Sequence, residues 1–382
     1  MRILAAPDKF KGSLTAAEAA LALARGAARA GPGIQVDTLP MADGGEGTAL
    51  ALLAAMGGRW VEVEVPGPLG EPVRAGFARL GDGSTAVLEM ASASGLALVP
   101  PGLRDVGRAS TLGTGMLLRA ATRSGVSRVI VCIGGSATND GGAGLAQALG
   151  YRLLDAEDRP IGPGGLGLES LERIDVLGYE NLLENVEISV ACDVDNPLCG
   201  PRGASTVFGP QKGADAATVA RLDAALGRLA AIVARDLHID VRTLPGGGAA
   251  GGLGAGLAAF ARGRLEPGVE LVARAVGLGG RLKDADLCLT GEGMLDASTA
   301  GGKVVAGVAR AARAAGVPCL AVVGRIGEGA GLVHAEGVDA CFSLCAGPMD
   351  LPEALARAST LLADAAEQAV RAFRAGRRSS EH

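Results

Sequence analysis

Short apolar runs alternate with polar, glycine-rich segments near the amino terminus of this chain. Residues 3–6 and 34–39 form two such runs, and an Ala/Leu-rich segment extends between them to about Ala30. Thr15 followed by Glu18 predicts a capping box at the start of a helix over that segment. The order strand, loop, helix, strand predicts a parallel sheet with right-handed crossovers.

The carboxy-terminal part of the chain shows the same alternation of strand-like and helix-like segments. It predicts three buried strands and two helices, over residues 286–290, 318–323 and 340–344 and over residues 303–315 and 351–375. We therefore expect both termini to contribute to one parallel sheet.

The middle of the chain follows another pattern. Residues 60–65, 73–80 and 86–90 alternate in polarity and are separated by Gly-Pro and Gly-Asp-Gly turns, which is typical of antiparallel strands. Further elements are then expected: a helix over 106–123, strands over 128–133 and 186–192, and a long helix over 216–236.

This change of pattern predicts an α/β protein of two domains. A Rossmann-like parallel-sheet domain is expected to be built from residues 1–62 and 284–378, with an inserted mixed α/β domain over 63–283. Residues 379–382 are set apart as a tail, and the polar end from residue 376 is expected to be frayed.

Composition narrows the class of protein. Apolar residues make up 48% and charged residues 20% of the 382 residues, which is typical of a soluble globular protein. A net charge of −5 and an aromatic content of 2% give no basic or stacking surface for nucleic acid. The amino terminus does not resemble a signal peptide and no apolar run is long enough to cross a bilayer. We expect a cytoplasmic protein with reduced cysteines and neither a nucleic-acid nor a membrane partner.

The strongest chemical signal is the segment 134–144, which directly follows the apolar run 128–133. It contains glycines for tight turns, Ser, Thr and Asn as donors, and one carboxylate, ahead of a helix-like stretch. Strand, glycine-rich turn and helix start is the arrangement that directs backbone N–H groups and a helix dipole at an anion such as phosphate. The segment therefore predicts a phosphate-handling enzyme.

Other predicted strand ends carry polar residues as well, and ligands of open α/β sheets bind beyond the carboxyl ends of the strands. The residues collected in this way are Asp8, Lys9, Lys11, Asp43, Glu46, Ser136, Asn139, Asp140, Asp193, Asp195, Glu292 and Asp296. Lysines and N–H groups that hold phosphates, with carboxylates that hold a divalent metal or orient a hydroxyl, suit phosphoryl transfer.

Each of these segments also has a structural interpretation. Lys9 and Lys11 could be solvated loop charges, and Asp43 could only begin a turn. Asp193 could belong to an Asx turn, and Lys212 could merely approach a helix cap.

The common phosphate and hydrolase signatures are missing. A Walker A match near Lys303 fails at Ala297 and Val304, and a GxGxxG match at residues 246–251 has no convincing acidic partner. None of the three histidines lies beside the polar loops, which argues against Ser-His hydrolysis.

Taken together, six segments in order resemble the bacterial type-1 glycerate kinases. They are residues 8–14, 42–48, 134–144, 191–198, 208–214 and 290–293, which read DKFKGSL, ADGGEGT, GGSATNDGGAG, ACDVDNPL, FGPQKGA and TGEG. The resemblance implies ATP-dependent phosphorylation of D-glycerate, Mg²⁺, and two α/β domains with the active site in the cleft between them. It departs at Met294, where the family usually has an arginine that could make a charge contact with substrate or nucleotide.

We assign roles in the implied kinase reaction to the positions that match the family's segments. Asp193 is expected to orient the attacking hydroxyl, with Asp43 next, and Lys212 is grouped with them as catalytic. The remaining assignments are Asp8, Lys9, Lys11, Ser13 and Glu46 to substrate, Gly134, Gly135, Ser136, Thr138, Asn139, Glu292 and Lys303 to the nucleotide, and Asp140 and Asp296 to the metal.

The sequence leaves alternatives. One is a metal-dependent phosphatase or isomerase of a small phosphorylated hydroxy acid, and another is a non-catalytic protein that binds an anionic metabolite. For the kinase, 2-phosphoglycerate is favoured only weakly over 3-phosphoglycerate as the product, and the oligomeric state stays open.

Overall fold

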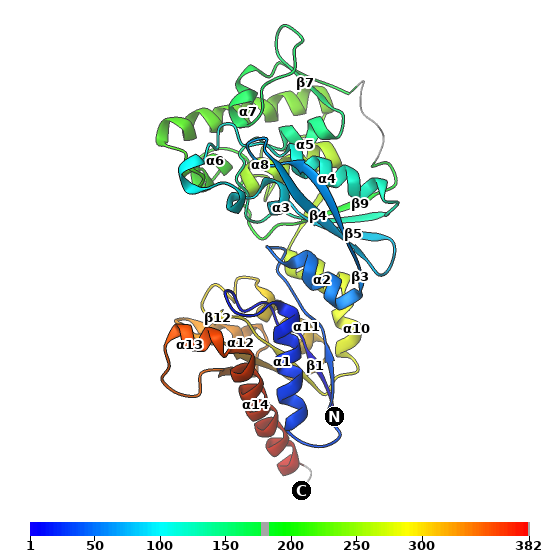
Figure 1. The fold of residues 1–382 in the computed structure, drawn as a ribbon, viewed down its shortest axis with the longest axis vertical. Coiled ribbons are helices and arrows are strands. Elements are labelled where there is room, and N and C mark those ends of the chain that lie inside the picture. The colour runs from blue at the N-terminus through cyan, green and yellow to red at the C-terminus, as the bar shows by residue number, and fades with distance from the viewer. Residues whose placement is uncertain (177–182, 381–382) are drawn as a thin grey trace. The chain divides into compact units, whose positions relative to one another are not determined.

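The structure is a computed structural model that describes residues 1–176 and 183–380. It divides into two compact units (Figure 1). The first comprises Met1–Asp43, Leu50–Gly57 and Val269–His382, and the second comprises Gly44–Ala49 and Gly58–Gly268. The domain boundaries expected from the sequence stay a prediction. The units differ from them in placing residues 44–49 and 58–62 with the second unit and 269–283 with the first.

The first unit is built on a parallel sheet with the order β15-β13-β11-β1-β2. Its strands are β1 (Arg2–Ala5), β2 (Gln35–Thr38), β11 (Leu287–Thr290), β13 (Cys319–Val323) and β15 (Ala340–Ser343). Both ends of the chain thus contribute to one sheet, as the repeated strand-and-helix pattern predicts.

Helices and short elements complete the first unit. They are α1 (Ala16–Arg29), α10 (Leu278–Leu282), α11 (Val304–Ala314), η5 (Ala330–Leu332), α12 (Val333–Glu336), α13 (Leu351–Ala356), α14 (Ala358–Ser380) and the two-stranded ladder of β12 (Met294–Leu295) and β14 (Arg325–Ile326). Two more helices, α2 (Thr48–Met56) and α9 (Gly268–Ala275), begin in the second unit and continue in the first.

Helix α1 shows how local sequence and packing agree. Its predicted capping box is present: Glu18 N donates to Thr15 Oγ1 at 3.2 Å, and Thr15 N donates to the Glu18 carboxylate at 2.8 Å. Helices α1 and α14 lie side by side (Figure 1), and a Cβ on Gly26 would come within 2.0 Å of the Ala363 carbonyl oxygen. Glycine at this position therefore permits the close approach of the two helices.

The second unit is built on a mixed sheet with the order β10-β9-β6-β5-β4-β3. Strands β3 (Gly58–Pro66), β4 (Pro72–Leu80) and β5 (Thr85–Glu89) pair antiparallel, and β5, β6 (Arg128–Cys132), β9 (Glu187–Ala191) and β10 (Arg264–Glu266) pair parallel. A small antiparallel pair joins β7 (Arg152–Leu154) to β8 (Arg173–Asp175).

The helices of the second unit are short except for α7. They are α3 (Ala91–Ser94), η1 (Leu96–Leu98), η2 (Pro101–Leu103), α4 (Leu112–Arg123), α5 (Ala143–Ala148), η3 (Gly165–Ser170), α6 (Ala204–Phe208), η4 (Pro210–Lys212), α7 (Ala216–Leu237) and α8 (Ala249–Ala261). The expected fold class, mixed α/β with one parallel and one mixed sheet, is confirmed.

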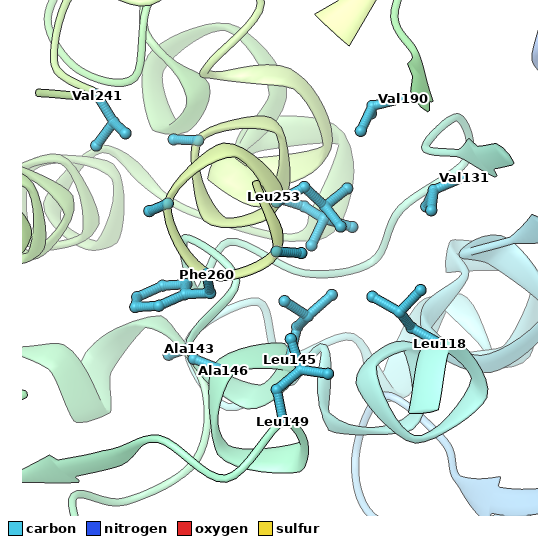
Figure 2. Close-up of a cluster of buried hydrophobic side chains, with 14 of the residues drawn as sticks. Leu118, Val131, Ala143, Leu145, Ala146, Leu149, Val190, Val241, Leu253 and Phe260 are labelled. Carbon is cyan, nitrogen blue, oxygen red and sulfur yellow. The ribbon is translucent and has the colours of Figure 1, made fainter. Parts of the chain in front are cut away.

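Two separate apolar cores support these sheets. In the second unit, Leu118, Val131, Leu145 and Leu253 belong to one buried cluster that Phe260 completes (Figure 2). This cluster lies directly behind the glycine-rich loop, because α5 follows that loop and contributes Leu145. The loop is therefore attached to the apolar core of its unit.

The structure corrects the sequence analysis in two helical segments. Helix α4 begins only at Leu112, because the residues before it form a loop in which Ser110 N donates to the Pro68 carbonyl oxygen at 2.8 Å. The last helix is interrupted at Arg357, whose φ and ψ are −101° and 4°.

The polar end of the chain, expected to be frayed, is helical as far as it is described. Helix α14 continues to Ser380, and residues 381–382 lie outside the described part of the chain. Contacts with sequence-distant groups explain the extra turns: Arg374 Nη1 donates to the Ala30 carbonyl oxygen at 2.5 Å, and Arg377 Nη1 donates to Asp286 Oδ1 at 3.5 Å. Across residues 1–176 and 183–380, no helix combines the length and apolarity needed to span a membrane.

Candidate functional site

The loop after β6 has the predicted strand, turn and helix arrangement. Gly135, Gly141 and Gly142 have φ values of 77°, 62° and 80°, in the left-handed region that favours glycine. Helix α5 follows directly, with Gly142 as its N-cap. The glycines are therefore required by the path of the backbone.

The amino end of α5, however, is already occupied by a carboxylate of the protein. Gly142 N donates to Asp140 Oδ1 and Gly144 N donates to Asp140 Oδ2, both at 3.2 Å. Thr111 donates to Asp140 Oδ2 through its backbone N and its Oγ1, both at 2.8 Å. Burial raises the pKa of Asp140, against the opposing effect of these hydrogen bonds. Asp140 thus anchors the loop to the start of α4.

Lys212 holds the same loop from η4. Its Nζ donates to Ser136 Oγ and to the Thr138 carbonyl oxygen, both at 2.7 Å. The side chain is only 2% exposed, and this burial lowers the pKa of Lys212 to about 7, although the negative charge of Asp140 opposes the shift. The lysine acts here as an internal support of the loop.

Only part of the loop faces solvent. Gly134 and Gly135 are exposed, whereas Ser136, Thr138 and Asn139 are buried, and Asn139 Nδ2 donates to Ser205 Oγ at 2.9 Å. The backbone of the two glycines is therefore the part of the loop that a phosphate can approach directly.

A second glycine segment supports the loop from behind, and the sequence analysis missed this role. The Gly251 carbonyl oxygen accepts a hydrogen bond from Gly141 N at 3.0 Å, and a Cβ on Gly251 would lie 1.9 Å from the Thr138 carbonyl oxygen. A Cβ on Gly256 would lie 2.5 Å from the Gly141 carbonyl oxygen. The only signal in the sequence was the glycine-rich run itself, which fits a dinucleotide motif only superficially.

In the first unit, carboxylates from three strand ends influence one another. Asp8 follows β1, Asp43 follows β2 and Glu292 follows β11, on neighbouring strands of the sheet. Burial raises the pKa of Asp8 to about 7, and the negative charges of Asp43 and Glu292 add to this shift. Burial also raises the pKa of Glu292, against the hydrogen bond that Thr299 Oγ1 donates to it at 2.7 Å. The strand-end rule therefore brings these three predicted residues together.

The predicted substrate lysines lie on the loop that follows Asp8. Lys9 N donates to Asp8 Oδ1 at 2.7 Å, Ser13 Oγ donates to the Phe10 carbonyl oxygen at 3.1 Å, and Lys11 is exposed between them. Ser13 thus closes a turn, and the ammonium group of Lys11 is presented to solvent.

Asp296 and Lys303 meet through a serine on the segment after β12. Ser298 N donates to Asp296 Oδ1 at 2.8 Å, and Lys303 Nζ donates to Ser298 Oγ at 2.7 Å. Hydrogen bonds from Ser298 lower the pKa of Asp296. Met294, at which the sequence resemblance departs, is 45% exposed on β12, where it pairs with Arg325 of β14.

The ends of β5 and β9 carry two more carboxylates. Asp193 follows β9, and its Oδ1 accepts a hydrogen bond from Gly268 N at 2.8 Å. Glu89 ends β5 and accepts hydrogen bonds from Gly47 N and Ala49 N, next to the exposed Glu46. Sequence reasoning missed Glu89, because nothing in a strand's last residue shows which backbone groups lie opposite it.

Comparison with known proteins shows to which family this chain belongs. The model of the family described as "Glycerate kinase family" matches residues 3–374. The chain belongs to the glycerate kinase family. A glycerate kinase of Halalkalibacterium halodurans is 49% identical over 95% of this chain and 96% of its own, and the glycerate 2-kinase of Escherichia coli is 46% identical over 93% of each. A crystal structure from Salmonella typhimurium LT2, described as a "putative glycerate kinase 2", has a TM-score of 0.92, 48% identity and 99% coverage of both chains.

The glycerate kinase membership confirms the resemblance seen in the sequence. The protein is a kinase, a phosphotransferase with an alcohol acceptor, and its small-molecule substrates are glycerate and ATP. This favours the kinase over the phosphatase, isomerase and binding-protein alternatives.

Proposed function

We propose that this kinase phosphorylates D-glycerate at its 2-hydroxyl group. The observation that supports the position is the name of the Escherichia coli relative, a glycerate 2-kinase that is 46% identical to this chain. No feature of the described residues favours the 3-hydroxyl.

In the proposed reaction, the 2-hydroxyl oxygen attacks the γ-phosphorus of ATP, the bond from that phosphorus to ADP breaks, and the hydroxyl proton passes to a carboxylate. We assign that carboxylate to Asp193, with Asp43 as the second choice. Lys9 and Lys11 would hold the carboxylate of glycerate, on the side of the loop that Asp8 and Ser13 support. Glu46 would contact the substrate as well.

For the nucleotide, we assign the backbone N–H groups of Gly134 and Gly135 to the phosphates, because these two residues are exposed. Ser136, Thr138 and Asn139 would act by holding this backbone in place. Lys212 would do the same, since its Nζ already donates two hydrogen bonds within the loop. We further assign Glu292 and Lys303 to the nucleotide.

Mg²⁺ is implied by the family, and its two predicted ligands differ in how well they fit. Within the described ranges 1–176 and 183–380, no group of three or more His, Cys, Asp or Glu side chains is arranged to hold a metal ion. Kinase Mg²⁺ commonly needs only one or two carboxylates beside the phosphates. Asp140 does not fit, because both oxygens accept internal hydrogen bonds in a fully buried position. Asp296 fits, because it is partly exposed and its pKa is lowered. When bound, the ion would neutralise charge on the transferred phosphate.

The position of phosphorylation is tested by phosphorus and carbon NMR of the product formed from D-glycerate and ATP. We expect the phosphorus to couple to the single proton on carbon 2. Coupling to the two protons on carbon 3 would overturn the proposal, and L-glycerate serves as the control for the configuration of the substrate.

The role of Asp193 is tested with Asp193→Asn and Asp193→Ala, and Asp195→Asn is the control. In Asp193→Asn, the amide oxygen can still accept the hydrogen bond from Gly268 N but no longer takes a proton at neutral pH. We expect kcat to fall by roughly 10²- to 10⁴-fold. The neighbouring Asp195→Asn, whose side chain is 81% exposed, should change kcat less than about twofold. If Asp193→Asn stays active and only Asp193→Ala loses activity, Asp193 positions α9 and is not the proton acceptor.

A further inference from the structure

The amino end of α2 is held by a carboxylate from a distant strand. Glu89 Oε1 and Oε2 accept hydrogen bonds from Gly47 N at 3.1 Å and 3.0 Å, and Oε1 accepts a further one from Ala49 N at 2.8 Å. In the same turn, Thr48 Oγ1 donates to the Gly45 carbonyl oxygen at 2.7 Å. The segment Gly44–Ala49 is therefore fixed on the second unit through its backbone.

A matching contact exists at the start of α9. Gly268, the first residue of this helix, donates its N–H group to Asp193 Oδ1 at 2.8 Å. The loop before α2 and the start of α9 are neighbours, because a Cβ on Gly44 would lie 3.2 Å from Gly268 Cα and 2.5 Å from Ala191 Cβ. Gly44 has a φ of 86°, so glycine is required there for its conformation as well as for the space.

The starts of α2 and α9 both lie at a boundary between the two units. The boundary between the units falls after Ala49 in α2 and after Gly268 in α9. The first residues of each helix lie in the second unit, and the following residues, such as Leu52 and Val272, are buried in the first. A carboxylate of the second unit thus binds each of these helices just before the chain passes into the first unit.

The physical effect of such a carboxylate is specific. The first N–H groups of a helix lack partners within the helix and carry a partial positive charge, so a negatively charged acceptor stabilises them and restricts their orientation. Because Glu89 occupies the amino end of α2, that end is not free to bind the carboxylate of a substrate. The loop before α2, with Glu46, instead acquires a fixed path.

We propose that Glu89 is a positioning residue of this kinase, which fixes the segment carrying Glu46 and the start of α2 relative to the second sheet. Asp193 does the same at α9 in addition to any role in proton transfer. The expected effect on catalysis rests on the proposed function of these loops. The hydrogen bonds from Glu89 to the backbone do not depend on that proposal.

The test compares Glu89→Gln and Glu89→Ala with Glu64→Gln, an exposed glutamate on β3 of the same sheet. Hydrogen exchange of the full-length protein is followed for the amides of Gly47 and Ala49. We expect Glu89→Ala to speed their exchange by roughly 5- to 30-fold, Glu89→Gln to have a smaller effect because one oxygen remains, and Glu64→Gln to have none. Unchanged exchange in Glu89→Ala would overturn the proposal.

Activity is measured on the same proteins as ADP release with D-glycerate. We expect the variant with the fastest amide exchange, Glu89→Ala, to have the lowest kcat, and Glu89→Gln to recover part of the activity. The KM for ATP should stay within about twofold of the wild-type value. Fast exchange with an unchanged kcat would overturn the positioning role. ADP release is independent of which hydroxyl accepts the phosphate, so these results are separable from those on the position of phosphorylation.

Discussion

At the scale of single residues, the buried charged groups of the glycine-rich loop are the unexpected feature. Asp140 and Lys212 matched the family pattern and were assigned to metal and to catalysis, yet their polar atoms bind other parts of the loop. A charged group taken out of water needs such partners, because its desolvation is otherwise costly. Both residues are therefore better explained as supports of the loop whose exposed backbone we assign to the nucleotide.

The titration of Lys212 gives a prediction at this scale. Because the pKa of Lys212 is lowered to about 7, the unfolded chain binds more protons than the folded protein between about pH 7 and 10. The free energy of unfolding should therefore rise with pH in this window, by up to about 1.4 kcal/mol per pH unit from this group. Lys212→Met removes this contribution, so the wild type should gain stability relative to the variant as the pH is raised.

Urea unfolding of both proteins at several pH values above 7 measures the difference. This window avoids most of the titration of Asp8, whose raised pKa makes the free energy of unfolding fall as the pH rises between about 4 and 7. Lys283→Met, which changes an exposed lysine, should give a curve parallel to that of the wild type. A parallel curve for Lys212→Met would show that Lys212 does not titrate as described.

At the scale of elements, the glycine-rich turn and the start of α8 form one structure. Ala250, Gly251 and Gly252 have left-handed φ values of 53°, 69° and 88° within α8, and this departure from helical geometry places the Gly251 carbonyl oxygen on Gly141 N. Two glycine segments more than 100 residues apart thus pack backbone against backbone.

Substitution of one glycine tests this packing. Gly251→Ala adds a Cβ in the left-handed region and within 1.9 Å of the Thr138 carbonyl oxygen, so we expect it to lower the free energy of unfolding by about 2–4 kcal/mol and to raise the KM for ATP. Gly227→Ala in α7 is the matched control. Apart from its chain neighbours and its own helix backbone, no atom lies within 4 Å of its added Cβ, and the change should stabilise the protein by about 0.5–1 kcal/mol. Equal effects of the two changes on stability would contradict the close packing.

At the scale of the whole molecule, the chain crosses four times between its two units: after Asp43, within α2 after Ala49, after Gly57 and within α9 after Gly268. The residues assigned to glycerate and to the nucleotide lie on loops of both units, and the convergence of these loops in one cleft stays a prediction. Family membership shows that the protein binds both glycerate and ATP. The residues assigned to each substrate can therefore be tested separately by measuring the binding of each ligand.

Ligand-induced stabilisation separates them. A ligand at about 100 times its Kd should stabilise the wild type by about 2.7 kcal/mol. We expect Ser136→Ala to reduce the shift in Tm caused by ATP with Mg²⁺ and to keep the shift caused by D-glycerate. Lys11→Ala should do the reverse, and Lys283→Ala should keep both. If Ser136→Ala and Lys11→Ala each lost both shifts equally, the division of the loops between the two substrates would be wrong.

The sequence by itself determined the fold class, the family and those elements that have a clear local pattern. The capping box at Thr15, the alternating strands from residue 60 and the strand before Gly134 are local patterns, and their spacing depends only on neighbours along the chain. Only the tertiary structure decided which polar groups form hydrogen bonds within the protein. Glu89, Asp140 and Lys212 each bind partners that are distant in sequence or set by the turn of the loop. Whether such a group faces a ligand or the protein itself depends on what lies opposite it in space.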